Sequence, residues 1–197
     1  KRLDRLEGQP SEVKTKKVVK VKKEVEKKKN ASLVDRISFK ADFRDRYEII
    51  DQEGSHGRER NRVRLRAALS MKVNDKASFT LGTATGGDDP VSTNQTLGDA
   101  YSTKDVRLDL AYMDYKFSKS TKLTAGKMKN PLYKPGKNSA FWDGDLNPEG
   151  VAFQFGGDLL TGSLVGFSVD ERKAASEALM FGGQAMYKFK VSGSSSL

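Results

Sequence analysis

The chain of 197 residues has no cysteine and only one histidine, His56. Without cysteine it cannot hold a disulfide framework, a Cys-based metal site or a thiolate nucleophile. A single histidine argues against a His-based catalytic triad and against a metal site with several imidazole ligands. We therefore expect no enzymatic activity, no metal site and no cofactor.

Long apolar runs are missing as well. No stretch of about 18 or more apolar residues exists, which excludes a transmembrane helix. No basic n-region precedes an apolar core, so we expect either a cytoplasmic protein or a mature form whose signal peptide has been removed. The mean hydropathy of −0.65 ordinarily argues against a membrane protein. A transmembrane β-barrel is the exception, because half of its spanning residues face a polar interior.

Positive charge is concentrated at the amino-terminal end. The net charge is +10, and residues 1–30 contribute +7 of it, from 12 Lys and Arg against 5 Asp and Glu. Runs of like charge are usually solvated. We predict that residues 1–34 form a short Lys-rich tail that is helical or disordered. A coiled coil that drives oligomerisation and a segment that binds an acidic polymer are the alternatives.

From residue 35 onward the dominant pattern has a period of two, which indicates β-strands. Apolar residues such as Phe39 and Phe43 alternate with polar ones, and no helical periodicity appears. The pattern predicts an all-β fold with about eight strands. They lie at residues 35–48, 62–73, 77–85, 105–117, 121–130, 149–157, 162–169 and 179–191.

The apolar side of each predicted strand can be named from the same alternation. In two strands it consists of Leu108, Leu110 and Tyr112, and of Val165, Phe167 and Val169. Aromatic residues also gather near the predicted short turns and suit an aromatic girdle at a membrane interface. These are Tyr112, Tyr115, Phe117, Tyr187 and Phe189.

The predicted connections alternate in length. They are long at 49–61, 86–104 and 131–148, moderate at 170–178, and short at 74–76, 118–120, 158–161 and 192–196. A membrane barrel places tight turns on one rim and extended loops on the other, whereas nothing sorts the loops of a soluble sandwich by length. Several predicted strands are also long enough to cross a tilted barrel wall.

One face of the second predicted strand is strongly basic. Arg60, Arg62, Arg64 and Arg66 occupy alternate positions, opposite six uninterrupted apolar residues. The previous strand adds Arg44 and Arg46. A soluble core cannot bury such a row without partners, because desolvation costs too much. The arginines must therefore face water, either outside a sandwich or inside a pore.

Three stretches resemble the bacterial putative porin family, which is similar in style to phosphate- and oligosaccharide-selective porins. They are PVSTNQTLG at 90–98, LTAGKMKNP at 123–131 and WDGDLNPEG at 142–150. With the arginine-rich strand, the resemblance covers roughly residues 36–157.

The resemblance implies a transmembrane antiparallel up-and-down β-barrel of about sixteen strands, often trimeric, for passive diffusion of small polar solutes. It also implies a bacterial outer-membrane location, with outer-membrane lipid and lipopolysaccharide as neighbours. About eight strands fit between residues 35 and 197. We therefore expect an amino-terminal portion of a larger barrel, or a barrel that is completed by something else.

Two sets of residues are candidate pore determinants. The first would set selectivity for anions: Arg44, Arg46, Arg60, Arg62, Arg64, Arg66, Lys127 and Lys129. The alternative is a salt-bridged wall in which Asp42, Glu48 and Asp109 neutralise the arginines. The second would form a constriction loop, or else a merely exposed loop: Lys134, Lys137, Trp142, Asp143 and Asp145. The acidic residues of this loop lack the full calcium-loop pattern.

Three functions compete at this level. The first is an outer-membrane porin for small polar or anionic solutes. The second is a non-conducting anchor or structural barrel whose tail at 1–30, on the periplasmic side, contacts peptidoglycan or a periplasmic partner. The third is a soluble basic protein that binds nucleic acid. We disfavour the third, because no aromatic residues interleave with the basic run at 14–29. We therefore expect no nucleic-acid partner.

Overall fold

The computed structural model describes residues 32–137 and 142–189 of the chain. Contacts divide the chain into two units, Lys1–Ile37 and Ser38–Leu197. The described part of the first unit contains a 3-10 turn at Leu33–Arg36, which Ser32 and Asp35 cap reciprocally. Most of the predicted basic tail lies outside the described residues, so its form and its role stay predictions. No helix among the described residues is long and apolar enough to cross a membrane.

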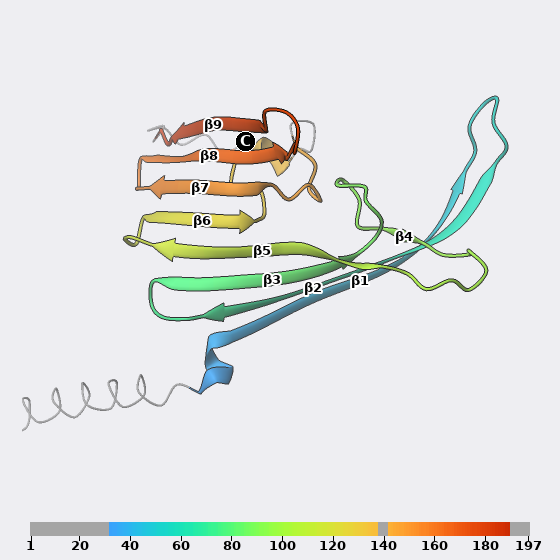
Figure 1. Ribbon diagram of the computed structural model, residues 1–197, viewed down its shortest axis with the longest axis horizontal. Coiled ribbons are helices and arrows are strands. Elements are labelled where there is room, and N and C mark those ends of the chain that lie inside the picture. Colours follow the sequence, from blue (N-terminus) through green and yellow to red (C-terminus); the bar gives the residue numbers. More distant parts are fainter. Residues whose placement is uncertain (1–31, 138–141, 190–197) are drawn as a thin grey trace, which may run out of the picture. The chain divides into compact units, whose positions relative to one another are not determined.

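The fold is all-β, with nine antiparallel strands in one up-and-down sheet (Figure 1). The order is β1-β2-β3-β5-β6-β7-β8-β9, and β4 pairs with β2 beyond the end of β3. Within the described residues the sheet is open, with β1 and β9 at its two edges. The strands are β1 (Ile37–Ile50), β2 (Arg58–Lys72), β3 (Ala77–Thr85), β4 (Gln95–Thr96), β5 (Val106–Lys116), β6 (Thr121–Lys127), β7 (Glu149–Gly156), β8 (Leu160–Asp170) and β9 (Ala178–Tyr187).

The all-β fold and the eight predicted strands are confirmed, with several boundaries shifted and one short strand added. β1 and β2 continue into the predicted first connection, which shrinks to residues 51–57. β6 ends at Lys127, so Lys129 lies beyond the strand. The ninth strand, β4, lies inside the predicted connection 86–104. It has two residues, too few for a period of two to be recognised.

The short and long connections lie at opposite ends of the sheet. Short turns link β2 to β3, β5 to β6 and β7 to β8, and they gather at one end (Figure 1). The connections between β3 and β5 and between β6 and β7 are long and lie at the other end, with those between β1 and β2 and between β8 and β9. The predicted sorting of connections by length is therefore confirmed in the described part of the chain.

The two faces of the sheet differ in what covers them. We call one the loop face, because the connections after β3 and β6 pack on it. It carries the even-numbered residues of β1 and β2. The other we call the apolar face, and many of its large apolar side chains are exposed, from Phe79 at 36% to Phe181 at 77%. One residue from each of six strands illustrates it: Leu65, Leu81, Met113, Val151, Leu164 and Phe181.

The predicted apolar side of β5 is wrong, and that of β8 lies on the loop face. In β5, a register shift opposite Gly82 and Thr83 leaves Asp109 as an extra residue. Leu108 therefore lies on the apolar face, whereas Leu110 and Tyr112 lie on the loop face. In β8, Val165 and Phe167 also lie on the loop face, where they are buried. Strict alternation could not reveal the bulge or the cover that the β6–β7 connection provides.

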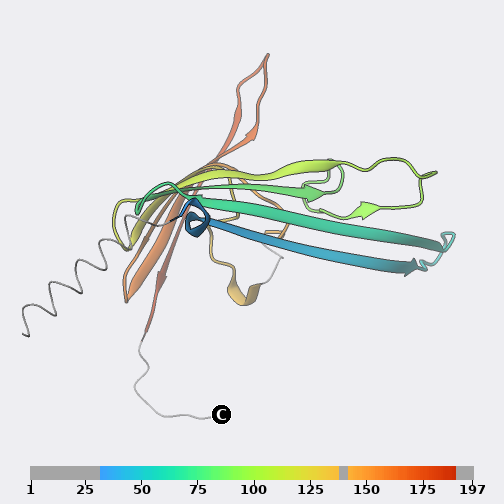
Figure 2. The same cartoon turned by 90° about the horizontal axis from the view of Figure 1, so that it is seen from below.

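The main buried cluster lies on the loop face and not between two layers of sheet. It contains Met128, Ala152, Val165 and Phe167. Leu132 and Trp142, from the connection between β6 and β7, pack against it. This connection is described at residues 128–137 and 142–148, and we call those residues the β6–β7 segment. Figure 2 shows that it leaves the sheet on one side.

Gly126 and Gly150 are register partners at the level where the β6–β7 segment departs. Gly126 has a φ of 116°, and a Cβ there would lie 2.2 Å from the backbone oxygen of Ala111. Backbone atoms cannot yield to such a contact without moving the strand. The close approach of β5 and β6 therefore requires glycine at this position.

Replacing Gly126 with alanine should lower the free energy of unfolding by at least about 1–3 kcal/mol, because it adds backbone strain and a clash. The matched control is Gly57→Ala, since Gly57 has open space around it. Denaturant unfolding in detergent measures both variants. Equal stability of the two would contradict the close approach of these strands.

Candidate functional site

The six predicted arginines of β1 and β2 lie together on the loop face. They alternate with the apolar residues of the same strands, so period-two geometry alone places them on one side. Arg64 donates to Asp42 at 2.8 Å, and Arg66 donates to the other carboxylate oxygen at 2.8 Å. Glu48 pairs with Arg46 and Arg60, and Arg62 lies 4.0 Å from it.

Carboxylates neutralise the arginine set only in part. The set consists of Arg44, Arg46, Arg60, Arg62, Arg64 and Arg66. All but Arg44, which binds Asn94, contact one or more of three carboxylates among the described residues: Asp42, Glu48 and Asp145. Six positive charges against three negative ones leave a net charge of +3 in this set. Asp109 does not join it. Its carboxylate instead lies 3.8 Å from Lys129 Nζ and accepts a hydrogen bond from Asn147.

Several guanidinium groups keep unused donors. The Nε atoms of Arg46, Arg62 and Arg64 are buried, and no hydrogen-bond partner lies among the described residues. Arg44 donates to Asn94 Oδ1, and Arg62 reaches the backbone oxygen of Asn94 at 3.4 Å. Asn94, in the connection after β3, thus binds two arginines that the sequence alone did not link to it.

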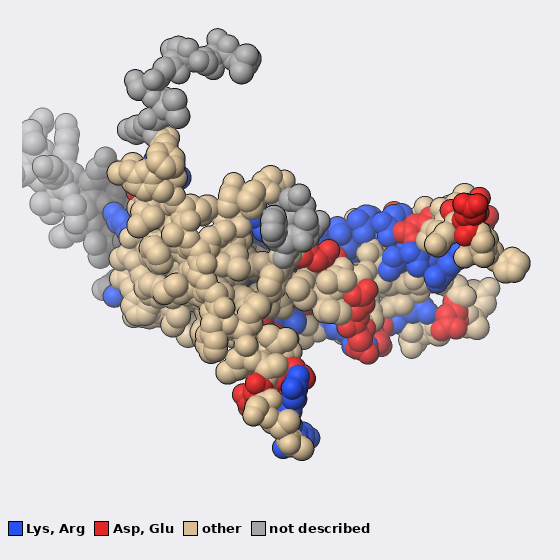
Figure 3. Space-filling model, turned by 90° about the horizontal axis from the view of Figure 1, so that it is seen from above, with Lys and Arg blue, Asp and Glu red and all other residues tan. Residues whose placement is uncertain are grey.

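Charged side chains gather at one end of the surface that Figure 3 shows. This is the end of the sheet where the long connections lie, and a broad uncharged surface covers the other end. Basic and acidic side chains stand next to each other there. The predicted basic row is therefore part of a mixed surface with a positive excess on β1 and β2.

The β6–β7 segment is held against the loop face by apolar packing and hydrogen bonds. The rings of Trp142 and Phe167 lie 6.1 Å apart, and Trp142 Nε1 donates to the oxygen of Leu146 at 2.9 Å. Met128, with 1% exposed, is the largest fully buried side chain of the described residues. The segment therefore lies on the same face of the sheet as the arginines.

Asp145 joins this segment to the arginine set. Its carboxylate accepts a hydrogen bond from Arg66 at 3.1 Å and one from Thr93 at 3.4 Å. Because Arg66 also binds Asp42, one guanidinium bridges β1 and the β6–β7 segment. Such a planar, forked donor suits two carboxylates better than an ammonium would.

The other predicted site residues take varied positions. Lys127 ends β6 and pairs with Glu149 at 2.8 Å, away from the arginines. Lys134 Nζ donates to the backbone oxygen of Trp142 at 3.2 Å. Asp143 accepts a hydrogen bond from the amide of Asp145. Lys137 ends the 3-10 turn Pro135–Lys137, and its side chain lies outside the described part.

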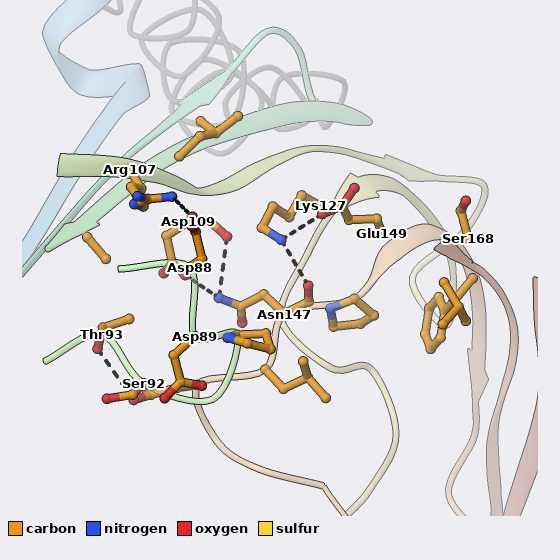
Figure 4. A pocket seen from close by; sticks show the side chains of 18 of the residues that line it. Asp88, Asp89, Ser92, Thr93, Arg107, Asp109, Lys127, Asn147, Glu149 and Ser168 are labelled. Carbon is orange, nitrogen blue, oxygen red and sulfur yellow. Dashed lines mark hydrogen bonds and ion pairs between the residues drawn. The ribbon is translucent and has the colours of Figure 1, made fainter. Parts of the chain in front are cut away.

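A pocket of about 620 Å³ opens at the end of the sheet that holds the long connections (Figure 4). Arg107 pairs with Asp88 there, Lys127 with Glu149, and Asn147 donates to Asp109. Acidic residues outnumber basic ones in its lining, so it does not extend the basic surface. The acidic ones are Asp88, Asp89, Asp109, Asp145, Glu149, Asp170 and Glu171, against Arg107 and Lys127.

The geometry around these carboxylates favours ion pairs over metal binding. No group of three or more His, Asp or Glu side chains that could hold a metal ion occurs in the part of the chain that the structure describes. Acidic residues that alternate in sequence near the end of this connection instead have separate partners: Asp145 of the β6–β7 segment pairs with Arg66, and Glu149, the first residue of β7, pairs with Lys127.

Sequence reasoning missed the residues that position the segment. They are Gln154, Ser163 and Gln184, which are polar residues at loop-face positions of β7 to β9. A polar residue at such a position is ordinary in any half-solvated strand. Only its contact with a segment distant in sequence distinguishes it, so no local signal could have identified these three.

Phe167 and Phe181 offer a matched test of which face is packed. Phe167 is 3% exposed on the loop face, and Phe181 is 77% exposed on the apolar face of the neighbouring strand. Phe167→Ala should lower the free energy of unfolding in detergent by about 3–5 kcal/mol, the usual range for a core phenylalanine. Phe181→Ala should cost much less. The opposite ranking in a denaturant titration would show that the β6–β7 segment does not cover the sheet.

Comparison with known protein families matches residues 51–194 to the family described as putative porin. The match covers all of β2 to β9 and well over half of the chain. A comparison with curated proteins found no matching sequence. Membership implies a porin-like role and, at a general level, an outer-membrane location, and it suggests a channel and not an enzyme. The chain therefore belongs to the putative porin family.

Proposed function

We propose that the sheet is part of the wall of an outer-membrane β-barrel through which small polar or anionic solutes diffuse passively. In this proposal the apolar face contacts lipid, and the loop face lines the pore. The observation that carries it is the opposition of these faces on single strands. β2 exposes Leu65 and Leu69 on one face and carries Arg64 and Arg66 on the other.

Lipid contact accounts for the exposed apolar face. Soluble proteins rarely expose contiguous apolar patches beyond a few hundred Å². Here large apolar side chains are exposed on the same face of strands from β1 to β9, for example Phe43, Leu81 and Phe181. A barrel in the outer membrane requires an outward apolar band of this kind.

Aromatic side chains on the apolar face support a membrane interface at the end with the short turns. Tyr115 and Phe117 lie edge to face at 5.1 Å, and Tyr187 and Phe189 do so at 4.9 Å. Phe153 continues the group at 6.4 Å from Phe117. Interfacial girdles of Tyr and Phe flank the apolar band of such barrels. Tyr112, predicted as a girdle residue, lies on the loop face instead.

Substituting Leu164 tests the lipid-facing assignment. Leu164 lies in the middle of β8 with 56% exposed. Leu164→Arg should weaken folding into lipid vesicles by about 2–4 kcal/mol if the residue lies near the bilayer midplane. Ala175→Arg, in the connection after β8, is the matched control and should have little effect. Equal folding yields for both variants would argue against lipid contact at this face.

The arginine set supports a preference for anions along β1 and β2. Its net positive charge raises the local concentration of anions and lowers that of cations. Arg62 carries much of this effect, because its contacts are long: 4.0 Å to Glu48 and 3.4 Å to the oxygen of Asn94. In this proposal Asp42 and Glu48 neutralise the arginines in part, and the remaining charge makes the lumen basic along β1 and β2.

Arg62→Gln should lower the ratio of anion to cation permeability by up to roughly fivefold, the effect of about 1 kcal/mol for one charge at 4 Å in water. Arg172→Gln is the control. Arg172 lies in the connection after β8 and forms an exposed ion pair with Asp170, the last residue of β8. Reversal potentials across planar bilayers under a salt gradient give the ratio. An unchanged ratio for Arg62→Gln would refute the role of this arginine in selectivity.

The β6–β7 segment is our proposed constriction. It lies on the loop face with Trp142, Lys134 and Asp145 all held by contacts to the wall or to the segment itself. A segment on the pore side of a barrel wall narrows the lumen at its own level. The solute path then runs beside it, along the arginines of β1 and β2.

The same bilayer recordings separate the channel from the non-conducting anchor. Ion current that scales with the number of inserted molecules supports the channel. Silence of correctly folded, inserted protein would overturn it and favour the anchor, whose tail at 1–30 would contact peptidoglycan. Contacts with lipopolysaccharide and a homotrimeric assembly belong to the proposal as well.

A further inference from the structure

A row of polar side chains crosses three neighbouring strands on the loop face. Gln154 of β7 is the register partner of Ser163 of β8, and Ser163 is the partner of Gln184 of β9. The row borders the buried apolar cluster that includes Ala152 and Val165. Polar side chains next to such a cluster are costly unless they form hydrogen bonds.

All three side chains bind the backbone of one short stretch of the β6–β7 segment. Gln184 accepts from the amide of Tyr133 at 2.7 Å and donates to its oxygen at 3.0 Å. Gln154 and Ser163 both donate to the oxygen of Pro131 at 3.3 Å. Gln184 thus pairs with Tyr133 as a neighbouring strand residue would.

The stretch needs these partners because its own sequence gives it few. Pro131 has no amide hydrogen and cannot join a regular ladder. The preceding Asn130 turns the chain, and its Oδ1 accepts from the amide of Leu132 at 2.9 Å. The carbonyls of Pro131 and Tyr133 are left for side chains of the wall. The hydrogen bonds to the Pro131 carbonyl are partly buried and those between Gln184 and Tyr133 are exposed, so each contributes a net stabilisation of about 0.5–1.5 kcal/mol.

We propose that Gln154, Ser163 and Gln184 are positioning residues that fix residues 130–134 to the wall and thereby keep the width of the pore constant. The statement about pore width rests on the proposed channel function. The statement about attachment does not, because it concerns contacts within the chain.

The attachment extends to the rest of the segment through Lys134. This lysine follows Tyr133 and donates to the backbone oxygen of Trp142 at 3.2 Å. Trp142 packs on Phe167, and farther along Asp145 binds Arg66 of β2. The segment is therefore held by side-chain amides at one end and by an ion pair at the other.

Hydrogen exchange at residues 130–134 tests the attachment. An amide exchanges when the segment opens, so its rate follows the equilibrium between the attached and the released states. Gln184→Leu removes two hydrogen bonds and should raise the exchange rate of this stretch by about ten- to a hundredfold. Amides in β7 and β8 serve as an internal reference and should keep their rates.

Two further variants exclude trivial explanations. Ser163→Ala removes a single donor with little change in volume, and it should raise the same rate by roughly fivefold. Gln52→Leu, in the exposed connection 51–57, is the matched control and should change nothing. Unchanged exchange at residues 130–134 in both loop-face variants would overturn the proposal. An equal rise in Gln52→Leu or throughout β7 and β8 would also overturn it, because the effect would then be general loosening.

Single-channel recordings of the same variants test the effect on pore width. The proposal predicts steady open-channel current for the unaltered protein and added current levels for Gln184→Leu, with Gln52→Leu unchanged. A steady current in Gln184→Leu, despite faster exchange, would overturn the claim about width. Absence of any current in the unaltered protein would refute the channel function alone, since the exchange data would still decide the attachment.

Discussion

The alternation of arginine with apolar residues along β2 is the constraint on which the rest of the structure depends. A guanidinium cannot be buried without partners, and a strand turns successive side chains to opposite faces. Arg62, Arg64 and Arg66 therefore commit one whole face of the sheet to water or to polar partners. The same geometry leaves Leu65 and Leu69 exposed on the opposite face, and an apolar environment there would stabilise them.

The loop face changes character from one side of the sheet to the other. On β1 and β2 it is charged, and carboxylates from both the wall and the β6–β7 segment share its arginines. On β7 to β9 it is apolar around Val165 and Phe167, and the β6–β7 segment packs on these residues. Arg66 lies where these regions meet, and it binds Asp42 and Asp145 together. One continuous face thus supplies both a charged surface and the apolar surface on which the segment packs.

The sequence predicts the strands well because their signal is local. The period of two and the sorting of connections by length place eight strands within a few residues of where they lie. The face of individual residues is harder. One extra residue at Asp109 puts Leu108 and Leu110 on opposite faces, and nothing in the local pattern marks it. The burial of Phe167 is equally hidden from the local pattern, since its cover comes from residues far away in sequence.

The residues of the candidate site likewise fall into those that a local pattern predicts and those that it does not. The arginine set follows from alternation alone, and so does the choice of Asp42 and Glu48 as partners, because they lie on the adjacent strand. The contacts of Asp109, Asn94 and Gln184 depend on how long connections fold back. Lys127 and Lys129 share a parity in sequence, but the strand ends between them, and they take different partners.

The central claim is that the faces of β2 meet different environments, water on one side and lipid on the other. Because the chain has no cysteine, single cysteines can be placed at each of residues 64–71 of β2 without background. The direct measurement is their reactivity toward a membrane-impermeant maleimide in the lipid-embedded protein. The account predicts labelling at the even positions 64, 66, 68 and 70 and protection at the odd positions between them. Uniform labelling, or labelling at the odd positions, would contradict it.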